Sequence, residues 1–334
     1  MPISATLGEM KEQQTKRHHF VPKAYLKAFC DGQGKVLVYR KDDPTHVLHQ
    51  APDATQLRRY YYSQPKPDGG RDNNTLEGYF STVETHWPEL VSKLHRREDV
   101  NGQLERIFEF MALQRVRVPA SRDAAEAMLA QTVKDTMKVM LANGRMPPPP
   151  PDLELDQIEV AIDPHQSIHA MATMLEGMGT LFSMLGFAAV HNATSRPFLT
   201  SDNPVLWFDP SLPFSEQRPY TIDPQGGAVF LFFPVSPAVA LVGSTDYKST
   251  FGQHGLLHSD VPDEAWVDQL NAQMCRFGYE AVIAQSRGQE ALVEEFAAVS
   301  PVHEAVSVPM AKGLVTIHRQ VFGTRAPKPK WRDE

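Results

Sequence analysis

Two adjacent histidines, His18 and His19, open the stretch "HHFVPKAYLKAF" and are of a residue type that could do chemistry. Pro22 suits the first turn of a helix, so both histidines are expected on extended backbone just before it, with side chains on roughly opposite sides. They are therefore not expected to chelate one metal together. A neutral histidine suits acid–base work near pH 7, whereas an imidazolium suits an anionic substrate. The alternative is a histidine that is hydrogen-bonded at a helix entry and has no chemical role.

Two carboxylates, Glu77 and Glu84, are seven residues apart in "TLEGYFSTVE". On a helix this spacing places both on nearly the same face, about two turns or ~10 Å apart. Glu77 falls in the first turn, where it can complete the electrostatics of a cap supplied by Asn73 or Asn74. Glu84 lies mid-helix among apolar neighbours and is the better functional candidate, with a solvent-facing carboxylate as the alternative.

Long polar side chains surround a helix break at Pro119, namely Gln114, Arg115, Arg117 and Arg122. Gln114 and Arg117 share a helix face at i, i+3 spacing. Arginines this close together could form a fork for phosphate or carboxylate. Arginines near a helix C-terminus also interact favourably with the helix dipole, so a purely structural role is equally open.

The stretch "TSDNPV" places three polar side chains, Ser201, Asp202 and Asn203, before Pro204. Proline favours an extended residue ahead of it, which indicates the end of a strand. In an active-site loop, Ser201 and Asp202 would face a cleft. The alternative is that Asp202 and Asn203 simply form a turn.

The standard catalytic signatures do not occur: there is no Gly-rich phosphate loop, no H-E-x-x-H, no G-x-S-x-G and no C-x-x-C pair. Two histidine pairs have i, i+4 spacing, His165 with His169 and His254 with His258. The first has no third ligand nearby and the second encloses a helix-weakening glycine, so we assign no metal ligands.

The composition indicates a globular protein of 334 residues, 42% of them hydrophobic, which is enough to bury a sizeable core. No apolar run reaches the ~18 residues that span a bilayer, and the polar N-terminus lacks a signal peptide core, so we expect a cytoplasmic protein without a membrane partner. The net charge of −7 argues against broad nucleic-acid binding. Both ends of the chain are basic, however, and together could form a local anion-binding surface.

The elements that must position these residues occur along the chain in the order strand, several helices, several strands and a helix. Apolar periodicity and Pro, Gly and Asp signals support this order. It predicts an α+β fold: a helical N-terminal half packed on a mainly antiparallel sheet, with a C-terminal helix. We expect helices at 75–95 (divided by Pro88), 104–118, from a Ser121 cap to about 143, at 165–185 and at 263–286, and strands at 35–40, 187–193, 196–205, 227–236 and 238–243.

We expect one globular domain over 1–334, because neither half alone shows a complete sheet pattern. The proline run from Pro147 to Pro151 would then be an exposed loop at 146–152 rather than a linker. Flexible ends are expected at 1–15 and 324–334.

Several motifs occur together in a fixed order: H-H-x-x-P-x-x-Y-L-x-x-F, "QLRRYYY", "LEGYFSTVE", "FMALQRVRVP", "FLTSDNPV", "FFPVSP" and "LNAQMCRFGYEAV". In this combination the chain resembles the domain-of-unknown-function 4238 family from His18 to about Val282. "YYY" stands where Phe-Tyr is expected, and the proline run departs from the family pattern. The resemblance implies a shared intracellular fold in one domain, and it implies no particular activity.

Our leading hypothesis from these residues is a hydrolase, nuclease-like, that acts on a phosphate-bearing substrate. One of the paired histidines would move the proton, the arginines would hold an anionic group, and the carboxylates would bind a divalent cation or orient water. The catalytic candidates are His18, His19, Glu84 and Asp202, and the substrate-binding candidates are Gln114, Arg115, Arg117, Ser201 and Asn203.

The alternative hypothesis is a noncatalytic binding or regulatory module, in which the same residues form a structural network. Ion-pair networks perturb pKa values as active sites do, so residue types alone do not separate the two hypotheses. They differ in whether the polar residues converge on an open cleft or on a closed core. No oligomeric state is predicted.

Overall fold

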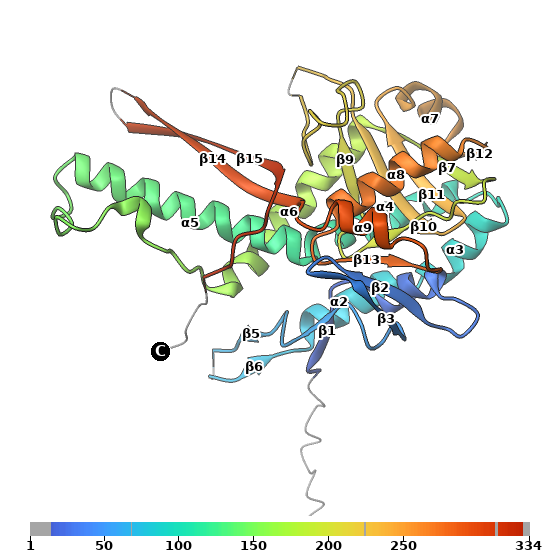
Figure 1. Cartoon of the computed structure of the whole chain (residues 1–334), viewed down its shortest axis with the longest axis horizontal. Coiled ribbons are helices and arrows are strands. Elements are labelled where there is room, and N and C mark those ends of the chain that lie inside the picture. Colours follow the sequence, from blue (N-terminus) through green and yellow to red (C-terminus); the bar gives the residue numbers. More distant parts are fainter. Residues whose placement is uncertain (1–14, 68, 224, 311–312, 330–334) are drawn as a thin grey trace, which may run out of the picture.

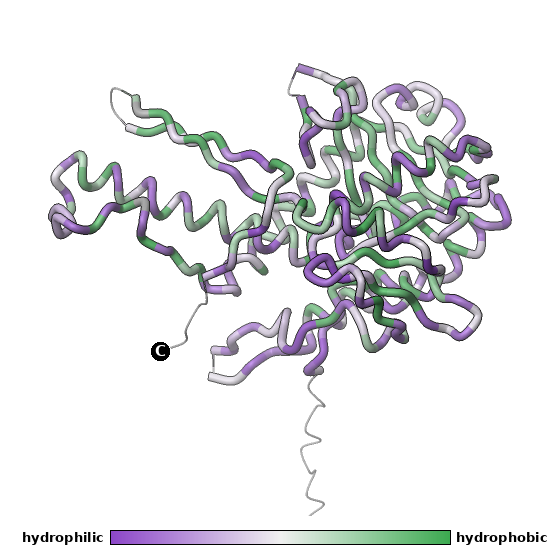
Figure 2. The backbone as a smooth tube through the Cα atoms, in the orientation of Figure 1, coloured by the Kyte–Doolittle hydropathy of each residue, from purple (hydrophilic) through white to green (hydrophobic). Residues whose placement is uncertain are grey.

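The computed structural model describes residues 15–329, except 68, 224 and 311–312. A body built on two sheets carries an arm, which consists of one long helix and one hairpin (Figure 1). The apolar residues gather in the strands of the body, whereas the arm mixes apolar and polar residues along its length (Figure 2).

The larger sheet has five strands, and all its pairings are antiparallel except that of β12 with β7. The smaller sheet has four strands and is antiparallel throughout. In order, the larger sheet contains β12 (Leu257–Val261), β7 (Gly186–Asn192), β11 (Val239–Ser244), β10 (Phe230–Ser236) and β9 (Leu206–Phe208), and the smaller contains β3 (Asp43–Gln50), β2 (Val36–Arg40), β13 (Ala281–Ala284) and β8 (Thr200–Ser201).

The helices are distributed along the whole chain. Short 3₁₀ turns adjoin or link several of them. The α-helices are α1 (Lys23–Leu26), α2 (Thr75–Glu84), α3 (Trp87–His95), α4 (Leu104–Arg117), α5 (Pro119–Ala142), α6 (Pro164–Met184), α7 (Lys248–His254), α8 (Glu264–Phe277) and α9 (Glu290–Glu295), and the 3₁₀ turns are η1 (Lys27–Phe29), η2 (Asn101–Gln103) and η3 (Leu155–Gln157).

Alternate residues of the strands enter two different apolar cores, as the period-two geometry of a strand requires. In β10, Phe233 belongs to the core that includes Phe110 of α4, whereas Phe232 belongs to the core that includes Met274 of α8. The smaller sheet divides in the same way, since Val38 joins the first core and its neighbours join the second. The two sheets therefore share one helical layer on each face.

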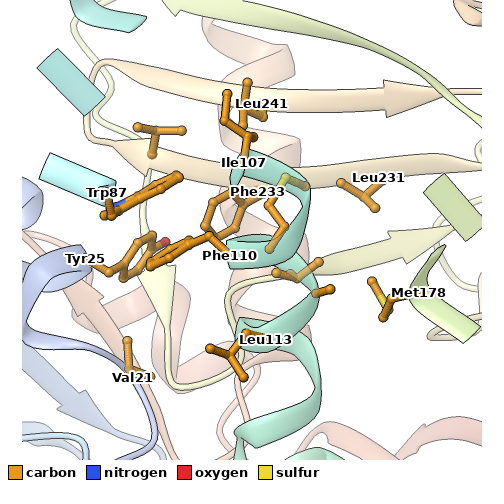
Figure 3. Close-up of a cluster of buried hydrophobic side chains, with 14 of the residues drawn as sticks. Val21, Tyr25, Trp87, Ile107, Phe110, Leu113, Met178, Leu231, Phe233 and Leu241 are labelled. Atoms are coloured by element: carbon orange, nitrogen blue, oxygen red, sulfur yellow. The ribbon is translucent and has the colours of Figure 1, made fainter. Parts of the chain in front are cut away.

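The first core holds the opening motif against the larger sheet (Figure 3). Trp87 and Phe110 stack with ring centroids 3.9 Å apart, and Tyr25 lies beside both. The Tyr25 hydroxyl donates a hydrogen bond to the carbonyl of Pro234 in β10 at 2.7 Å. Because Tyr25 follows the paired histidines in the same short segment, this contact fixes where the histidines lie.

Three two-stranded sheets complete the fold: β1 (Arg17–His19) with β4 (Leu57–Arg59), β5 (Gln64–Pro65) with β6 (Arg71–Asp72), and β14 (Ser300–Met310) with β15 (Gly313–Gly323). The last pair lies along α5 and forms the arm with it (Figure 1). The hydroxyl of Thr316 donates to the Asp135 carboxylate at 2.5 Å and thereby ties the hairpin to the helix.

The segments that were expected to be exposed or flexible differ in their contacts. The proline run links α5 to α6 at the far end of the arm, and its described side chains are exposed or half-buried. The described part of the C-terminal segment is tied down, because Arg325 pairs with Glu280 at 3.3 Å and Lys328 pairs with Asp123 at 2.9 Å. Residues 1–14 and 330–334 lie outside the described residues.

The predicted α+β class with antiparallel sheets is confirmed, and three local predictions are wrong. The predicted cap, Ser121, lies inside α5, which begins at Pro119. The predicted helix at 263–286 ends at Phe277, after which Ala281–Ala284 form a central strand. The chain also continues past its last helix into the β14–β15 hairpin, which was not predicted.

Candidate functional site

A polar pocket of about 330 Å³ lies where β1, the first turn of α1, α2 and the end of α4 meet. We call it the His19–Glu77 pocket. It brings together the histidine, glutamate and arginine segments that the sequence singled out. Its charged or titratable lining residues are Arg17, His19, Lys23, Asp53, Glu77, Glu84 and Arg117.

The strand β1 places the two histidines in different surroundings. It pairs with β4, so that His18 lies opposite Arg58 and His19 opposite Leu57. Successive side chains of a strand point to opposite faces. His18 consequently points into the core, and His19 lines the pocket.

His18 is fully buried, and both of its ring nitrogens are satisfied. Nδ1 accepts a hydrogen bond from the backbone N–H of Tyr62 at 2.8 Å, so Nε2 carries the proton and donates to the carbonyl of Thr15 at 3.2 Å. Burial lowers the pKa of His18, against the opposing effect of the Thr15 bond. His18 is thus a neutral group that anchors β1 to Tyr62.

His19 differs, because its Nε2 is buried and has no hydrogen-bond partner among the described residues. Burial lowers its pKa to about 4, and the positive charges of Lys23 and Arg117 add to this effect. A hydrogen bond with the backbone of Asp53 opposes the shift and holds the ring. At neutral pH the imidazole is uncharged and offers a ring nitrogen to whatever occupies the pocket.

Glu77 is the second lining residue with a free buried atom, Oε1. Burial raises its pKa to about 7, with Arg117 opposing and Glu84 adding to the shift. The carboxylate is not needed as a cap, because Asp72 accepts from the backbone N–H groups of Asn74 at 2.9 Å and Thr75 at 3.0 Å. Glu77 therefore titrates near neutrality inside the pocket.

Arg117 and Glu84 form the inner wall of the pocket as an ion pair. Nη1 of Arg117 donates to Oε1 of Glu84 at 2.6 Å, and the arginine is almost fully buried. Its Nε donates to the carbonyl of Phe20 at 3.1 Å and its Nη2 to the carbonyl of His19. The arginine fork is thus largely occupied, and its role is to hold Glu84 and the backbone of β1 in place.

Four other predicted residues gather with Tyr220 in a second, closed group, which we call the Asp202 cluster: Arg115, Ser201, Asp202, Asn203 and Tyr220. None of them lines the His19–Glu77 pocket. The Arg115 guanidinium lies 3.7 Å from the centre of the Tyr220 ring and donates to the hydroxyl of Ser121. No carboxylate pairs with it in the described part of the chain, and burial lowers its pKa.

The turn at Ser201–Asn203 is completely buried and is bonded mainly to backbone. The two carboxylate oxygens of Asp202 accept from the N–H groups of Tyr279 at 2.7 Å and Glu280 at 2.6 Å. Asn203 donates to the carbonyl of Phe277 at 2.8 Å and to the Tyr220 hydroxyl, and Ser201 accepts from the N–H of Asn203. Burial raises the pKa of Asp202 to about 6. The turn fastens β8 to the link between α8 and β13.

Two further predicted residues lie outside the pocket lining. Gln114 is fully buried, and neither atom of its amide has a partner among the described residues. Arg122 joins α5 to the start of α6, since it donates to the Ser167 hydroxyl at 3.0 Å and to the Pro164 carbonyl at 2.8 Å.

The carboxylates that were expected to share a cation have separate partners: Glu84 is held by Arg117, and Asp202 by backbone N–H groups. Within the described residues, no group of three or more His, Cys, Asp or Glu side chains is arranged to hold a metal ion.

Arg17 and Lys23 were not among the sequence candidates, although both line the pocket. Their signal was their spacing from His19: Arg17 lies two residues before it on the same strand face, and Lys23 opens the helix that follows. The sequence predicts a capping role for Glu77, whereas the carboxylate of Asp72 performs that task in the structure.

The family of the chain follows from its similarity to known proteins. None of the helices in the described part of the chain could span a membrane. Neither a curated protein nor a solved structure matches the chain significantly. The model of one family, described as a protein of unknown function (DUF4238), matches residues 17–288, which include the Asp202 cluster and the lining of the His19–Glu77 pocket apart from Thr15, but not β14–β15. Because that match spans most of the chain, the protein belongs to the DUF4238 family.

Proposed function

We propose that the His19–Glu77 pocket binds a small anionic molecule and exchanges protons with it, and that the reaction is hydrolysis of a phosphate-bearing substrate. One observation carries the proposal: two buried polar atoms, His19 Nε2 and Glu77 Oε1, line the same pocket without partners. Buried polar atoms in folded proteins are nearly always hydrogen-bonded, so such a pair fits a site that a ligand or water completes.

Glu77 supplies the acid–base chemistry in this proposal. With a pKa of about 7 it is half protonated at neutral pH, which suits a general acid or a general base. As the base, Glu77 takes a proton from the attacking water, whose oxygen bonds to phosphorus while the ester P–O bond breaks. The leaving oxygen then takes a proton from solvent or from the protonated Glu77. His19 Nε2 accepts a hydrogen bond from the water and orients it.

The positive side chains at the pocket supply the anion binding. Arg17 and Lys23 are exposed, and neither forms an ion pair with a carboxylate in the described ranges. Their charges favour phosphate oxygens. The volume of about 330 Å³ is at the small end of the range for ligand pockets. Together with the net charge of −7, this favours a small phosphate ester over a nucleic-acid duplex. We propose a cytoplasmic setting for this activity.

A second candidate function is a binding module that holds the anion without turnover. The arrangement of Arg117 favours it, because Glu84 and two backbone carbonyls occupy much of its donor fork. A fork that is occupied in this way contributes positive charge but does not close around a transferring phosphoryl group.

The test compares turnover with binding in the same variants. p-Nitrophenyl phosphate is the substrate probe, assayed from about pH 5 to pH 9 with and without added Mg²⁺ or Mn²⁺, and inorganic phosphate is the binding probe. We expect turnover with a pH transition near 7 that Glu77→Gln abolishes. Glu105→Gln, at an exposed position in the first turn of α4, is the matched control and should leave both turnover and binding unchanged.

Three outcomes separate the hypotheses. Turnover that disappears in Glu77→Gln but not in the control supports the hydrolase. Phosphate binding without turnover under any condition replaces the hydrolase with the binding module. The absence of both binding and turnover in the folded wild type overturns the site itself.

A further inference from the structure

A second pocket, of about 520 Å³, lies on the other helical layer and shares no residue with the His19–Glu77 pocket. Its walls come from β9, β10, the loop at 209–217, α8 and the end of α9. We call it the Gln273 pocket. Five aromatic side chains form part of its wall: Phe208, Phe214, Phe230, Trp266 and Phe296.

The rings touch one another in pairs around the pocket. Phe208 and Phe230 have centroids 5.7 Å apart, and Phe230 meets Trp266 edge to face at 6.4 Å. Phe214 also meets Phe296 edge to face at 6.0 Å. Paired rings of this kind present flat apolar surface and polarised edges, which suit a planar aromatic guest.

The polar side chains of the lining are Gln217, Gln269, Gln273 and Glu295, and a chain of hydrogen bonds fixes the orientation of Gln273. The Gln217 Nε2 group donates to the carbonyl of Leu212 at 2.9 Å, so the Gln217 Oε1 atom is left as an acceptor. Gln273 must then turn its Nε2 toward that acceptor, as it does. The Oε1 atom of Gln273 is consequently left buried, with no partner among the described residues, in a residue that is only 3% exposed.

The loop that carries this chain is held in place without a ligand. Arg276 donates to the carbonyl of Phe214 at 2.5 Å, and its guanidinium lies 4.6 Å from the Phe214 ring centre. A wall that is fixed in advance loses little conformational entropy when a guest binds.

The charge of the lining indicates whether the bound molecule is neutral or anionic. Glu295 is the charged side chain in the lining, and it is exposed at the rim. An anionic guest would meet this carboxylate and no cation of the lining, whereas a neutral guest meets no electrostatic penalty.

We propose that the Gln273 pocket binds a neutral planar aromatic molecule of bicyclic size that bears a ring N–H donor. The rings of the pocket pack against its faces and edges, and Gln273 Oε1 accepts the hydrogen bond from its N–H. This site is independent of the proposed hydrolase site, since the guest is uncharged and the two linings have no residue in common.

The experiment uses two probes of the same shape that differ in one donor, indole and benzofuran, titrated into the full chain by calorimetry. We expect indole to bind about tenfold more tightly, because benzofuran leaves the buried oxygen without a partner. Ala272→Trp, which fills the pocket from α8, should abolish binding of both probes. Ala265→Trp, at an exposed position in the first turn of the same helix, is the matched control and should leave binding intact.

A second variant tests the acceptor. Gln273→Met keeps the length of the side chain but removes the oxygen, so indole should lose its advantage over benzofuran, while benzofuran binds as before. Equal binding of the two probes to the wild type, binding that survives Ala272→Trp, or no binding of indole at millimolar concentration would each overturn the proposal. If Ala272→Trp does not fold, the wild-type comparison of indole with benzofuran and the Gln273→Met variant still decide it.

Discussion

The His19–Glu77 pocket and the Asp202 cluster contain the same kinds of residue, yet they differ in what their carboxylates touch. Burial raises the pKa of both Glu77 and Asp202, to about 7 and about 6. Asp202 has a backbone N–H on each carboxylate oxygen, whereas Glu77 has a buried oxygen with no partner in the described structure. A shifted pKa alone therefore does not identify a functional carboxylate, and an unmet hydrogen-bonding need beside a cavity is the better sign.

The same contrast separates two arginines of α4, because Arg117 lines the His19–Glu77 pocket and Arg115 belongs to the Asp202 cluster. Arg117 is paired with Glu84 at the wall of an open pocket, whereas Arg115 stacks on Tyr220 in the core and has no carboxylate partner among the described residues. They are two residues apart on α4, so their side chains leave the helix in different directions. Two nearby arginines of one sequence motif thus lie in different surroundings, one in the closed core and one at the pocket.

Removal of the Asp202 carboxylate tests the closed side of the comparison and has the largest expected effect. Asp202→Ala leaves two buried backbone N–H groups without acceptors, so the free energy of unfolding should fall by about 3–5 kcal/mol. Urea denaturation measures the loss. Asp209→Ala removes a carboxylate from a surface turn and should cost less than about 1 kcal/mol. A small loss in Asp202→Ala would show that the cluster is not the structural fastening described above.

The paired histidines offer the next test, because each belongs to one side of the comparison. His18→Ala removes a ring that accepts from the backbone of Tyr62 and should cost about 2–3 kcal/mol. His19→Ala removes a ring whose Nε2 has no partner, so stability should change by less than about 1 kcal/mol while phosphate binding weakens. Equal stability losses in the two variants would contradict the division between core and pocket.

Stability as a function of pH tests the carboxyl of Glu77. Its pKa in the folded protein, about 7, lies above the ordinary value of 4.5, so ionisation disfavours the folded state. The stability that the protonated group contributes is complete below pH 4.5 and is lost as pH rises through 7. Glu77→Gln should therefore be more stable than the wild type by about 1–2 kcal/mol near pH 8.5 and equally stable near pH 4, after allowance for partial solvent screening. An identical difference in stability at both pH values would place the carboxyl in solvent.

The smallest effect on stability is expected for Lys23, which lies exposed at the rim of the pocket. Lys23→Ala should change the free energy of unfolding by less than about 0.5 kcal/mol, yet weaken phosphate binding by about threefold to tenfold. Lys27→Ala, four residues later at an exposed position outside the lining, is the matched control. If both variants bind phosphate like the wild type, the rim charges do not take part in binding.

Local sequence signals predicted most of the helices, and they failed where partners distant in the sequence decided the structure. Pro119 begins a helix, as its fixed φ angle favours, so Ser121 was not needed as a cap. The segment Ala281–Ala284 continues an apolar pattern but becomes a strand, because Gly278 ends the helix and because β2 and β8 pair with the segment from both sides. Local sequence does not separate Glu77 from Asp202, because the backbone N–H groups that satisfy Asp202 belong to Tyr279 and Glu280, which are distant in the chain.

The order of the smaller sheet has a consequence for how the protein is made. Its central pairing joins β2, at Val36–Arg40, to β13, at Ala281–Ala284, so the partner of this strand is synthesised only after most of the helices and the whole larger sheet. Contacts between such distant segments close large loops and slow folding. The strand that follows the histidine motif must remain unpaired on that edge until β13 has been synthesised, and a truncated product that ends before β13 leaves the hydrogen-bonding groups of β2 open to other chains.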